Sequence, residues 1–299
     1  MSNKDNYVIF NPEGGLGKII ASTAVIKYIQ KEYPDHKIVI ITPWPEVYLN
    51  NPRIHRVFRS GNTPYFYKDY LRDRESVVLK GEPYFNTSHL YSKQHLIKSW
   101  CELFNLPFDG DVTPELYFTL NEKEIYTDLT KRDKPTLVMQ TNGGLYNSNK
   151  SYSWTRDMPY KQAQILADEL HKQYHILHVG NKNCKKLNNV EMYNEIPNKR
   201  SLIGILINSS KRLLIDSCLQ HAAAAFDLKS TVCWVSTESK VFGYEMHNNI
   251  KSVLPFNDVD ANGIDSLFFD YDFNGPEHEY PFDTDDVFNL QEVYDSIIK

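Results

Sequence analysis

The sequence predicts an α/β protein built from two Rossmann-like domains that face each other across a cleft. Three observations lead to this fold class. Short apolar strands alternate with amphipathic helices, the alternation starts afresh near residue 133, and each start is a strand followed by a glycine-rich turn. The 299 residues are enough for two domains, each with its own core. We place the boundary in the polar, proline-ending linker Lys131–Pro135, which gives domains of residues 1–132 and 133–299.

The first domain opens with a βαβ unit, whose crossover is expected to be right-handed. It consists of a buried strand, a glycine-rich turn, a helix and a second buried strand, at Tyr7–Phe10, Asn11–Gly17, Lys18–Tyr33 and Lys37–Thr42. Further along the chain we expect a strand, a helix and a loop, at Val77–Lys80, His95–Phe104 and Leu106–Pro114.

The second domain repeats this alternation. It opens with the strand Thr136–Gln140 and a second glycine turn at residues 141–144. The strands and helices expected after it are Tyr160–Tyr174, His175–Val179, Ser201–Asn208, Arg212–Ile215, His221–Phe226 and Thr231–Val235. A final helix, Asp285–Ile298, follows an irregular, aromatic and acidic stretch, Asp258–Phe282. Because ligands of such sheets bind beyond the carboxyl ends of the strands, we expect both glycine turns to line the cleft.

The composition is that of a globular protein, with 41% hydrophobic and 24% charged residues. The net charge of −5 is spread unevenly, because residues 252–299 contain twelve Asp or Glu and one Lys. The rest of the chain is mildly basic, which suits an anionic ligand such as a nucleotide diphosphate. It lacks the dense basic stripe that binds nucleic acid. The alternative is scattered, solvated charge with an acidic tail.

The cysteines and the N-terminal residues predict where in the cell the protein is found. Cys101, Cys184, Cys218 and Cys233 form no CxxC pair, which argues against a zinc site or a disulfide framework and fits a reducing environment. The start of the chain has no apolar signal-peptide core, and no apolar run reaches the length of about 18 residues that a membrane helix needs. We therefore expect a cytoplasmic protein without a membrane span.

The first glycine turn, residues 11–18, excludes two nucleotide-binding motifs. A P-loop needs glycine where Pro12 stands and Ser or Thr where Ile19 stands. A dinucleotide fingerprint beginning at Gly15 and Gly17 would have Ile20 in place of its third glycine. What remains is a backbone that a ligand can approach closely, or a tight turn with a purely structural role.

A second candidate site follows the strand that ends in Ile215. Asp216 is expected to emerge at the cleft, where its carboxylate can accept hydrogen bonds from sugar hydroxyls. Ser217 and Cys218 then open a helix whose free amides and dipole favour a diphosphate. Asp216 could instead be only the N-cap of that helix. His221 lies one turn further, either reaching a phosphate or packed in the core.

Three segments together resemble the heptosyltransferase-like family 9 glycosyltransferases, which have the GT-B fold. The first is GGLGKIIASTAVIKYIQKEYPDHKIVIIT with the following NNPRIHRVF. The second is Asn142-Gly143-Gly144 with Arg156-Asp157-Met158-Pro159. The third and most specific is IDSCLQHAAAAFDLKSTVCWVS, similar to a D-S-G-x-x-H-x-A-A-A element of the family. The resemblance spans roughly residues 7–250.

The resemblance implies an inverting transfer of a hexosyl, pentosyl or heptosyl group from a nucleotide diphosphate sugar to a saccharide or other hydroxyl acceptor. The donor is a substrate, and neither a cofactor nor a metal is required. Arg156 is expected to stabilise the leaving diphosphate because its fork of donors matches phosphate oxygens, and Lys150 is the competitor for this role. The expected donor-binding residues are Gly15, Gly17, Asn142, Gly143, Arg156, Asp216, Ser217, Cys218 and His221.

Two residues depart from the family pattern. Cys218 stands where the family has glycine, and Lys18 aligns with the family's catalytic aspartate. An inverting transfer needs a base for the acceptor proton, which an ammonium group cannot be unless burial lowers its pKa strongly. Lys18 could instead hold a phosphate. Glu13 is the nearest alternative base, followed by His89, Asp69 or no dedicated base.

Aromatic residues in the first domain suggest where an acceptor binds. Tyr65–Tyr67 and Tyr84-Phe85 could stack on sugar rings, although core packing explains such residues equally well. Three further functions stay open: sugar transfer to a modified DNA base, nucleotide-sugar epimerisation, and non-catalytic binding of a nucleotide sugar. Nucleic acid as the acceptor is not favoured, because no dense basic stripe is present.

Overall fold

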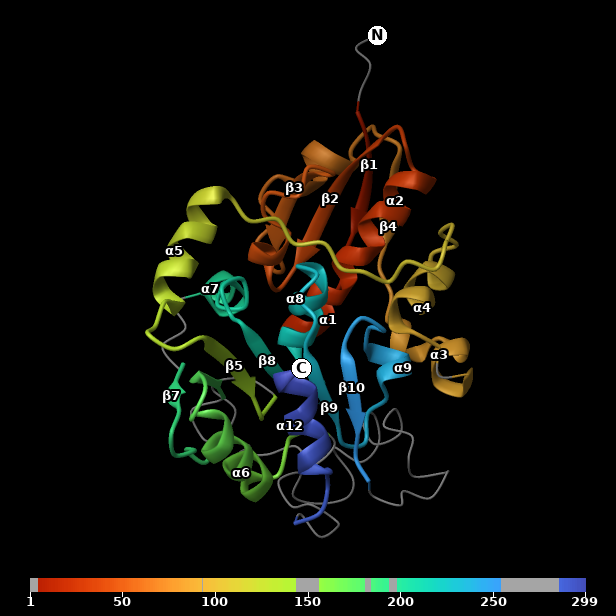
Figure 1. Cartoon of the computed structure of the whole chain (residues 1–299). Helices are drawn as coiled ribbons and strands as arrows, with labels where there is room; N and C mark the ends of the chain where they lie inside the picture. Colours follow the sequence, from red (N-terminus) through yellow and green to blue (C-terminus); the bar gives the residue numbers. More distant parts are fainter. Residues whose placement is uncertain (1–4, 93, 144–155, 181–183, 194–197, 254–284) are drawn as a thin grey trace. The chain divides into compact units, whose positions relative to one another are not determined.

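The structure is a computed structural model, and it describes residues 5–92, 94–143, 156–180, 184–193, 198–253 and 285–299. The chain forms two compact units, Met1–Thr119 and Leu120–Lys299. Each unit is an α/β layer structure around a parallel sheet (Figure 1).

The first unit contains a four-stranded parallel sheet in the order β3-β2-β1-β4. Its strands are β1 (Asn6–Phe10), β2 (His36–Thr42), β3 (Ile54–Arg59) and β4 (Ser76–Leu79). Its α-helices are α1 (Leu16–Ser22), α2 (Ile26–Glu32), α3 (Thr87–Ser92) and α4 (Leu96–Leu103). Shorter helical turns are η1 (Thr23–Val25), η2 (Pro45–Tyr48), η3 (Tyr67–Leu71) and η4 (Pro83–Phe85).

Both faces of this sheet are covered, which explains why its central strand is apolar at nearly every position. On one face, Tyr7 and Ile9 pack with Phe66 and Tyr70 of the η3 region. On the other face, the ring of Phe10 meets Trp100 of α4 edge to face, with ring centroids 6.4 Å apart. A parallel sheet buried on both faces is expected to read as a continuous apolar run rather than an alternating one.

The helix expected over Lys18–Tyr33 is wrong as a single element, because α1 and α2 are separated by the 3₁₀ turn η1. The hydroxyls of Ser22 and Thr23 donate to the carbonyls of Ile19 and Ile20, each at 2.7 Å. Such bonds back to the preceding turn compete with the regular helical pattern and bend helices.

The second unit contains a six-stranded parallel sheet in the order β10-β9-β8-β5-β6-β7. Its strands are β5 (Thr136–Gln140), β6 (His175–Val179), β7 (Glu191–Met192), β8 (Lys211–Ile215), β9 (Thr231–Trp234) and β10 (Asn248–Lys251). Its helices are α5 (Leu120–Thr130), α6 (Tyr160–Leu170), α7 (Lys199–Gly204), α8 (Cys218–Ala225), α9 (Ser239–Phe242) and α12 (Leu290–Ile298).

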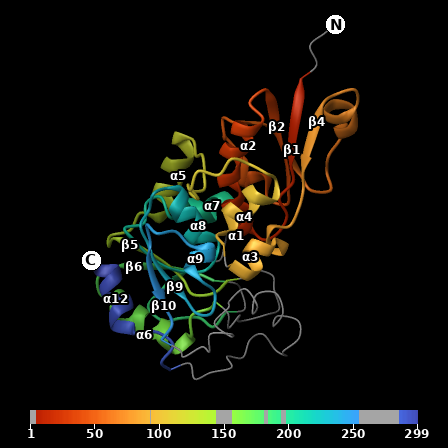
Figure 2. The same cartoon turned by 90° about the vertical axis from the view of Figure 1, so that its right-hand side faces the viewer.

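The connections of the second sheet run in two directions. From β5 the chain moves to β6 and β7, and then it returns past β5 to β8, β9 and β10. Since crossovers between parallel strands are right-handed, helices of the two directions cover opposite faces. Figure 2 shows α6 and α12 on one side of the sheet and α7 and α8 on the other.

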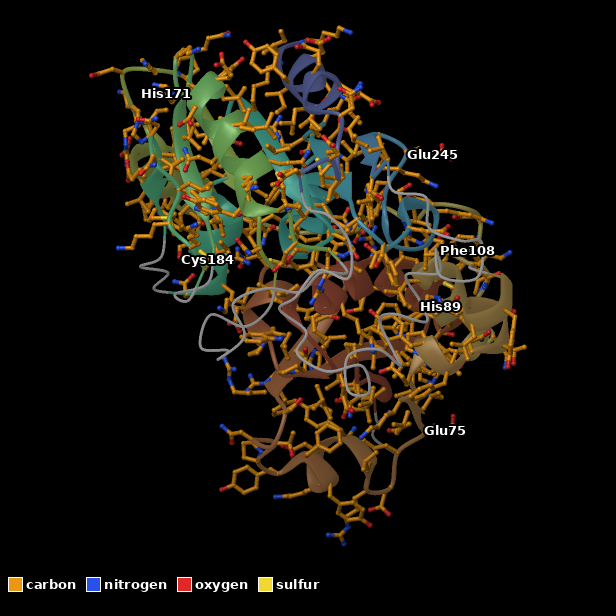
Figure 3. All side chains as sticks on the ribbon, turned by 90° about the horizontal axis from the view of Figure 1, so that it is seen from below. Glu75, His89, Phe108, His171, Cys184 and Glu245 are labelled. Carbon is orange, nitrogen blue, oxygen red and sulfur yellow. The ribbon has the colours of Figure 1, made fainter. Side chains whose placement is uncertain are left out.

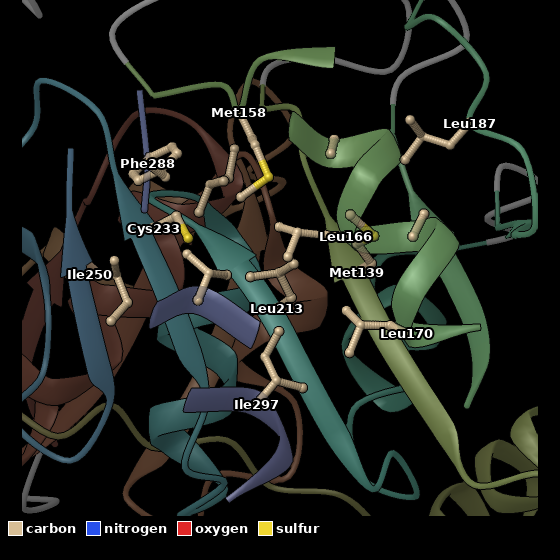
Figure 4. Packing of buried hydrophobic residues seen from close by; sticks show 14 of the residues in the cluster. Met139, Met158, Leu166, Leu170, Leu187, Leu213, Cys233, Ile250, Phe288 and Ile297 are labelled. Carbon is tan, nitrogen blue, oxygen red and sulfur yellow. The ribbon is translucent and has the colours of Figure 1, made fainter. Parts of the chain in front are cut away.

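The α6 and α12 face carries the main apolar core of this unit (Figure 4). Met139 and Leu213 of the sheet pack there against Leu166 and Leu170 of α6 and Ile297 of α12. The final helix thus completes a core that begins more than a hundred residues earlier. It starts at Leu290, after its N-cap Asn289, which accepts a hydrogen bond from the amide of Glu292 at 3.2 Å.

Helix α5 packs with the second unit, so the division between the units falls after Thr119. Its residues lie before the boundary expected from the sequence, between residues 132 and 133. The side chain of Arg200 in α7 is 6% exposed and makes two bonds to Glu122, with Nε–Oε1 and Nη2–Oε2 distances of 2.5 and 2.9 Å. Tyr126 lies directly against Gly204. No local sequence pattern reveals these contacts.

Candidate functional site

The second sheet changes direction between β5 and β8, and the expected donor-binding residues of the second unit follow these strands or begin the helix after β8. Asn142 and Gly143 follow the carboxyl end of β5, and Asp216 and Ser217 follow that of β8. In parallel α/β sheets, ligands bind in the crevice outside the carboxyl ends of the strands at such a switch point. The topology therefore brings together the second and third segments noted in the sequence.

A buried hydrogen-bond network fixes the turn after β5. The carboxylate of Asp157, 1% exposed, accepts from the Gly143 amide at 2.8 Å and from Asn142 Nδ2 at 3.2 Å. The Thr141 hydroxyl donates to Asn142 Oδ1 at 2.8 Å and lies 2.7 Å from His178 Nε2. Since a hydroxyl donates only one proton, Nε2 of His178 is the donor to Thr141. Burial lowers the pKa of His178 to about 4, so the ring is neutral.

Arg156 lies beside this turn. A Cβ atom on Gly143 would be 3.5 Å from Arg156 Nε and 3.6 Å from its Cζ, so the guanidinium covers the side of the turn that has no side chain. Asp216 is buried, and burial raises the pKa of its carboxyl group, while the charge of Arg156 acts in the opposite direction. Arg156, Gly143 and Asp216 thus form one polar cluster.

Asp216 is not the N-cap of the helix that follows it, so that alternative is wrong. The N-cap of α8 is Ser217, which has extended backbone angles and makes no side-chain capping bond. Its hydroxyl instead accepts from Gln140 Nε2 at 3.2 Å. The carboxyl group of Asp216 instead feels the positive charge of Arg156, which lowers its pKa against the effect of burial.

On α8, Cys218 is partly buried and His221 is buried. Burial raises the pKa of the Cys218 thiol, which keeps it neutral. His221 is 6% exposed, and its Nδ1 lies 2.8 Å from the hydroxyl of Tyr244, whose ring it meets edge to face. Burial and the charge of Asp216 raise the pKa of Tyr244, which places its ring near that carboxylate. His221 is therefore built into the wall of the site.

The first sheet has its own switch point, between β1 and β4, and the first glycine turn lies there. Gly14 has φ +121°, a conformation that disfavours other residues, and its carbonyl accepts from Trp44 Nε1 at 3.2 Å. Gly15 is the N-cap of α1, and Gly17 lies in the first turn of that helix.

Lys18 turns back from α1 and pairs with Glu82, which follows β4. Its Nζ bonds to both carboxylate oxygens of Glu82 and lies 4.4 Å from the ring centroid of Tyr84. Burial lowers the pKa of Lys18, and the hydrogen bond and charge of Glu82 oppose this shift. The sequence analysis missed Glu82, although an acidic residue just beyond the expected strand Val77–Lys80 was the available signal.

The other candidate bases lie in different surroundings. Glu13 is exposed and pairs with Lys80, with 3.1 Å between Oε1 and Nζ. His89 is fully buried and its pKa is lowered by burial; Figure 3 shows it inside the first unit, with Glu75 at the edge. Asp69 lies near the start of β4, because the carbonyl of its neighbour Tyr70 accepts a hydrogen bond from Ser76, the first residue of that strand. Glu82 follows the other end of β4.

The expected acceptor aromatics are separated by the fold. Tyr65 and Tyr67 are 77% and 68% exposed beside η3, while Phe66 packs into the core. Tyr84 lies at the carboxyl edge, against Lys18, and Phe85 points into solvent. Tyr84 joins the first switch point through its contact with Lys18.

Some expectations lie outside the described residues, namely Lys150, Gly144 and the acidic stretch Asp258–Phe282. In the described ranges, no group of three or more His, Cys, Asp or Glu side chains has the arrangement of a metal site. Nor do those ranges contain a helix with the length and hydropathy of a membrane span. All four cysteines are free.

A cavity of about 920 Å³ lies at the amino ends of β8, β9 and β10, away from Asp216.

Solved structures of glycosyltransferases share the fold of this chain, whereas no protein-family model and no curated protein sequence matches it. The E. coli ADP-heptose LPS heptosyltransferase II has a TM-score of 0.62 at 12% identity, over 84% of this chain and 91% of its own. A family 9 glycosyltransferase from Veillonella parvula has a TM-score of 0.60 at 11% identity, over 83% and 85%. The E. coli heptosyltransferase WaaC, solved with ADP, has 0.53 at 11% identity, over 82% and 93%. These similarities, with the two parallel sheets, confirm the predicted GT-B class of α/β fold.

Proposed function

We propose that this protein is a glycosyltransferase that moves a sugar from a nucleotide diphosphate sugar to a hydroxyl group of a glycan-type acceptor. The observation that carries this is the cluster of Arg156, Gly143 and Asp216 at the switch point of the second sheet, beside the start of α8. The shared fold supports the class of donor, because solved relatives in fold are named for ADP-heptose or were solved with ADP.

The cluster suits a donor in three ways. A planar guanidinium can bind two phosphate oxygens at once, and the amides at the start of α8 favour negative charge. Gly143 contributes by having no side chain, because its own amide already donates to Asp157. The carboxylate of Asp216 can accept hydrogen bonds from sugar hydroxyls. The proposal adds Asn142, Ser217, Cys218 and His221 to the donor site, and it includes Gly15 and Gly17 of the turn in the first unit.

The proposal assigns the donor to the second unit and the acceptor to the first. The transfer would be inverting and would need no metal, because Arg156 and the helix amides can hold the charge of the leaving diphosphate. We also propose a cytoplasmic location, which the four free cysteines support. Glu13 stays a candidate for the acceptor-side base, beside Glu82.

The test begins with thermal-shift screening of ADP-, UDP- and GDP-sugars, because a ligand that binds only the folded state raises the melting temperature. For the best donor, Arg156→Ala should weaken nucleotide binding by about 1.5–3 kcal/mol, the range of a hydrogen bond to a charged group. Isothermal calorimetry measures this. Arg132→Ala, at an exposed ion pair with Glu191, is the matched control and should bind normally. Unchanged affinity in Arg156→Ala would contradict the site.

A second candidate function is non-catalytic binding of a nucleotide sugar. The observation in its favour is Lys18, which stands where the family that the sequence resembles has its catalytic aspartate. Release of free nucleotide in the presence of acceptor, with a glycosylated product, decides for the transferase. Tight donor binding without release or hydrolysis would favour the binding protein.

A further inference from the structure

Glu82 lies at the edge of the first sheet where a ligand is expected to bind. It follows β4 directly, and β4 pairs with β1 at the point where the connections of this sheet change direction. The turn at Gly14 follows β1 on the other side of the same crevice. A group that reacts with a bound substrate would stand here, by the same rule that locates the cluster around Asp216.

Three hydrogen-bond contacts hold the carboxylate of Glu82 in one orientation. Lys18 Nζ bonds to both of its oxygens, and the amide of Tyr84 donates to Oε1 at 3.2 Å. The side chain of Glu82 is 34% exposed, whereas that of Lys18 is 8% exposed. Of the two partners, only the carboxylate is open to a ligand.

The first glycine turn is shaped around the Lys18 side chain. A Cβ atom on Gly14 would lie 2.9 Å from Lys18 Cδ, so the turn needs glycine there to let the side chain fold back. The ring of Tyr84 lies under the ammonium, and Trp100 lies 5.8 Å away. A buried ammonium is costly unless it is paired, and Glu82 is its pair.

We infer that Glu82 is the acceptor-side base of the proposed transfer, and that Lys18 is the positioning residue that holds its carboxylate. This inference rests on the proposed function. As the acceptor oxygen forms its bond to the anomeric carbon, its proton passes to a carboxylate oxygen of Glu82. The bond from that carbon to the diphosphate breaks, and its electron pair leaves with the diphosphate. Glu82 ends as the neutral acid, and Lys18 keeps its charge throughout.

Glu13 is the competing base, and its surroundings are different. It is 58% exposed on the solvent side of the turn, and its ion-pair partner is Lys80, which is 56% exposed. An exposed pair of this kind holds neither side chain firmly. The oriented carboxylate of Glu82 fits the need for a base placed within hydrogen-bond reach of the reacting hydroxyl.

The test measures transfer with the donor found by screening and the acceptor it modifies. Glu82→Gln should lower kcat by about 10²–10⁴-fold while the affinity for the donor stays unchanged. Formate or azide added to Glu82→Ala should restore part of the rate in proportion to its concentration. That rescue would not follow from a loss of folding. Glu75→Gln, at the opposite end of β4, is the matched control and should keep its full rate.

The positioning role of Lys18 is tested by a double-mutant cycle on kcat. Lys18→Met should slow transfer, yet the double variant with Glu82→Gln should be no slower than Glu82→Gln alone, because both changes remove one function. Purely structural effects would multiply instead, and would count against the role of Lys18.

Two results overturn the inference. One is transfer by Glu82→Gln within about threefold of the wild-type rate, and the other is loss of about a hundredfold in Glu13→Gln with no loss in Glu82→Gln. These results leave the proposed function intact, because the wild-type protein still transfers sugar. Absence of transfer by a wild-type protein that binds the donor would instead contradict the proposed function, and this inference with it.

Discussion

At the scale of single residues, a substitution at Gly143 should weaken nucleotide binding without affecting folding. Its Cβ position is 3.5 Å or more from Arg156 and Asp157, which is ordinary contact distance, so Gly143→Ala should fold normally. The added methyl group would nevertheless fill the space beside the guanidinium where we place the diphosphate. We expect the free energy of unfolding to change by less than about 0.5 kcal/mol, while nucleotide affinity falls at least about tenfold.

Urea unfolding and calorimetry on the same preparation check this expectation. The matched comparison is Arg156→Ala, which opens the space and removes the charge. Normal nucleotide binding by Gly143→Ala would show that the ligand does not approach this face of the turn.

The sequence anticipated which residues of the second unit meet at its switch point better than it did for the first unit. Arg156, Gly143 and Asp216 lie in recognisable segments, so their meeting at one switch point followed from the order of strands and helices. The roles of Glu82 and Asp157 depend on the residues that they bind. Glu82 binds Lys18, 64 residues away along the chain, and Asp157 binds the amide of Gly143, and both contacts form only when the chain folds. Linear spacing carries no signal for such pairs.

At the scale of elements, the contact between α5 and α7 depends on Gly204. A Cβ atom there would lie 2.3 Å from Cδ2 of the buried Tyr126 ring, so something must shift. Alanine favours helices over glycine by about 1 kcal/mol, but overpacking costs about 1–3 kcal/mol. We therefore expect Gly204→Ala to lower the free energy of unfolding by up to about 2 kcal/mol, measured in urea.

A second substitution tests the cause. Tyr126→Leu should lower stability by itself, yet cost less in the Gly204→Ala background, because the clash is with the ring. Additive effects of the two changes would mean that Gly204 is sensitive for another reason.

Element boundaries show where sequence patterns reach their limit. The alternation of strands and helices predicted β1, β2, β4, β5, β6, β8 and β9 within a few residues. It missed β3, β7 and β10, whose buried residues are few, and it missed α5, in which the buried positions are Tyr126 and Thr130. Elements that lie at the edge of a sheet or pack along a narrow strip leave a weak apolar pattern.

At the scale of the whole molecule, buried histidines set the response to acid. Burial lowers the pKa of His178 and of His247 to about 4. Between pH 6.5 and about 4 the unfolded chain binds protons that the folded protein does not, so the free energy of unfolding falls as the pH falls through this window. Each histidine should contribute about 3 kcal/mol of that loss.

Urea unfolding at pH 7 and pH 4.5 measures the effect. His178→Gln can still donate to Thr141 but does not titrate, so it should shrink the difference between the two pH values. A difference equal to that of the wild-type protein would contradict the role of His178.

The position of α5 also decides where the second unit can be cut from the chain. A fragment that begins at residue 133 would lose Glu122, the carboxylate partner of Arg200 in α7, and with it the helix that covers this guanidinium. The free energy of unfolding of the second unit should fall as a result. The fragment would also lose the packing of the Tyr126 ring against Gly204. A truncated protein made to study nucleotide binding in isolation should therefore start no later than Leu120.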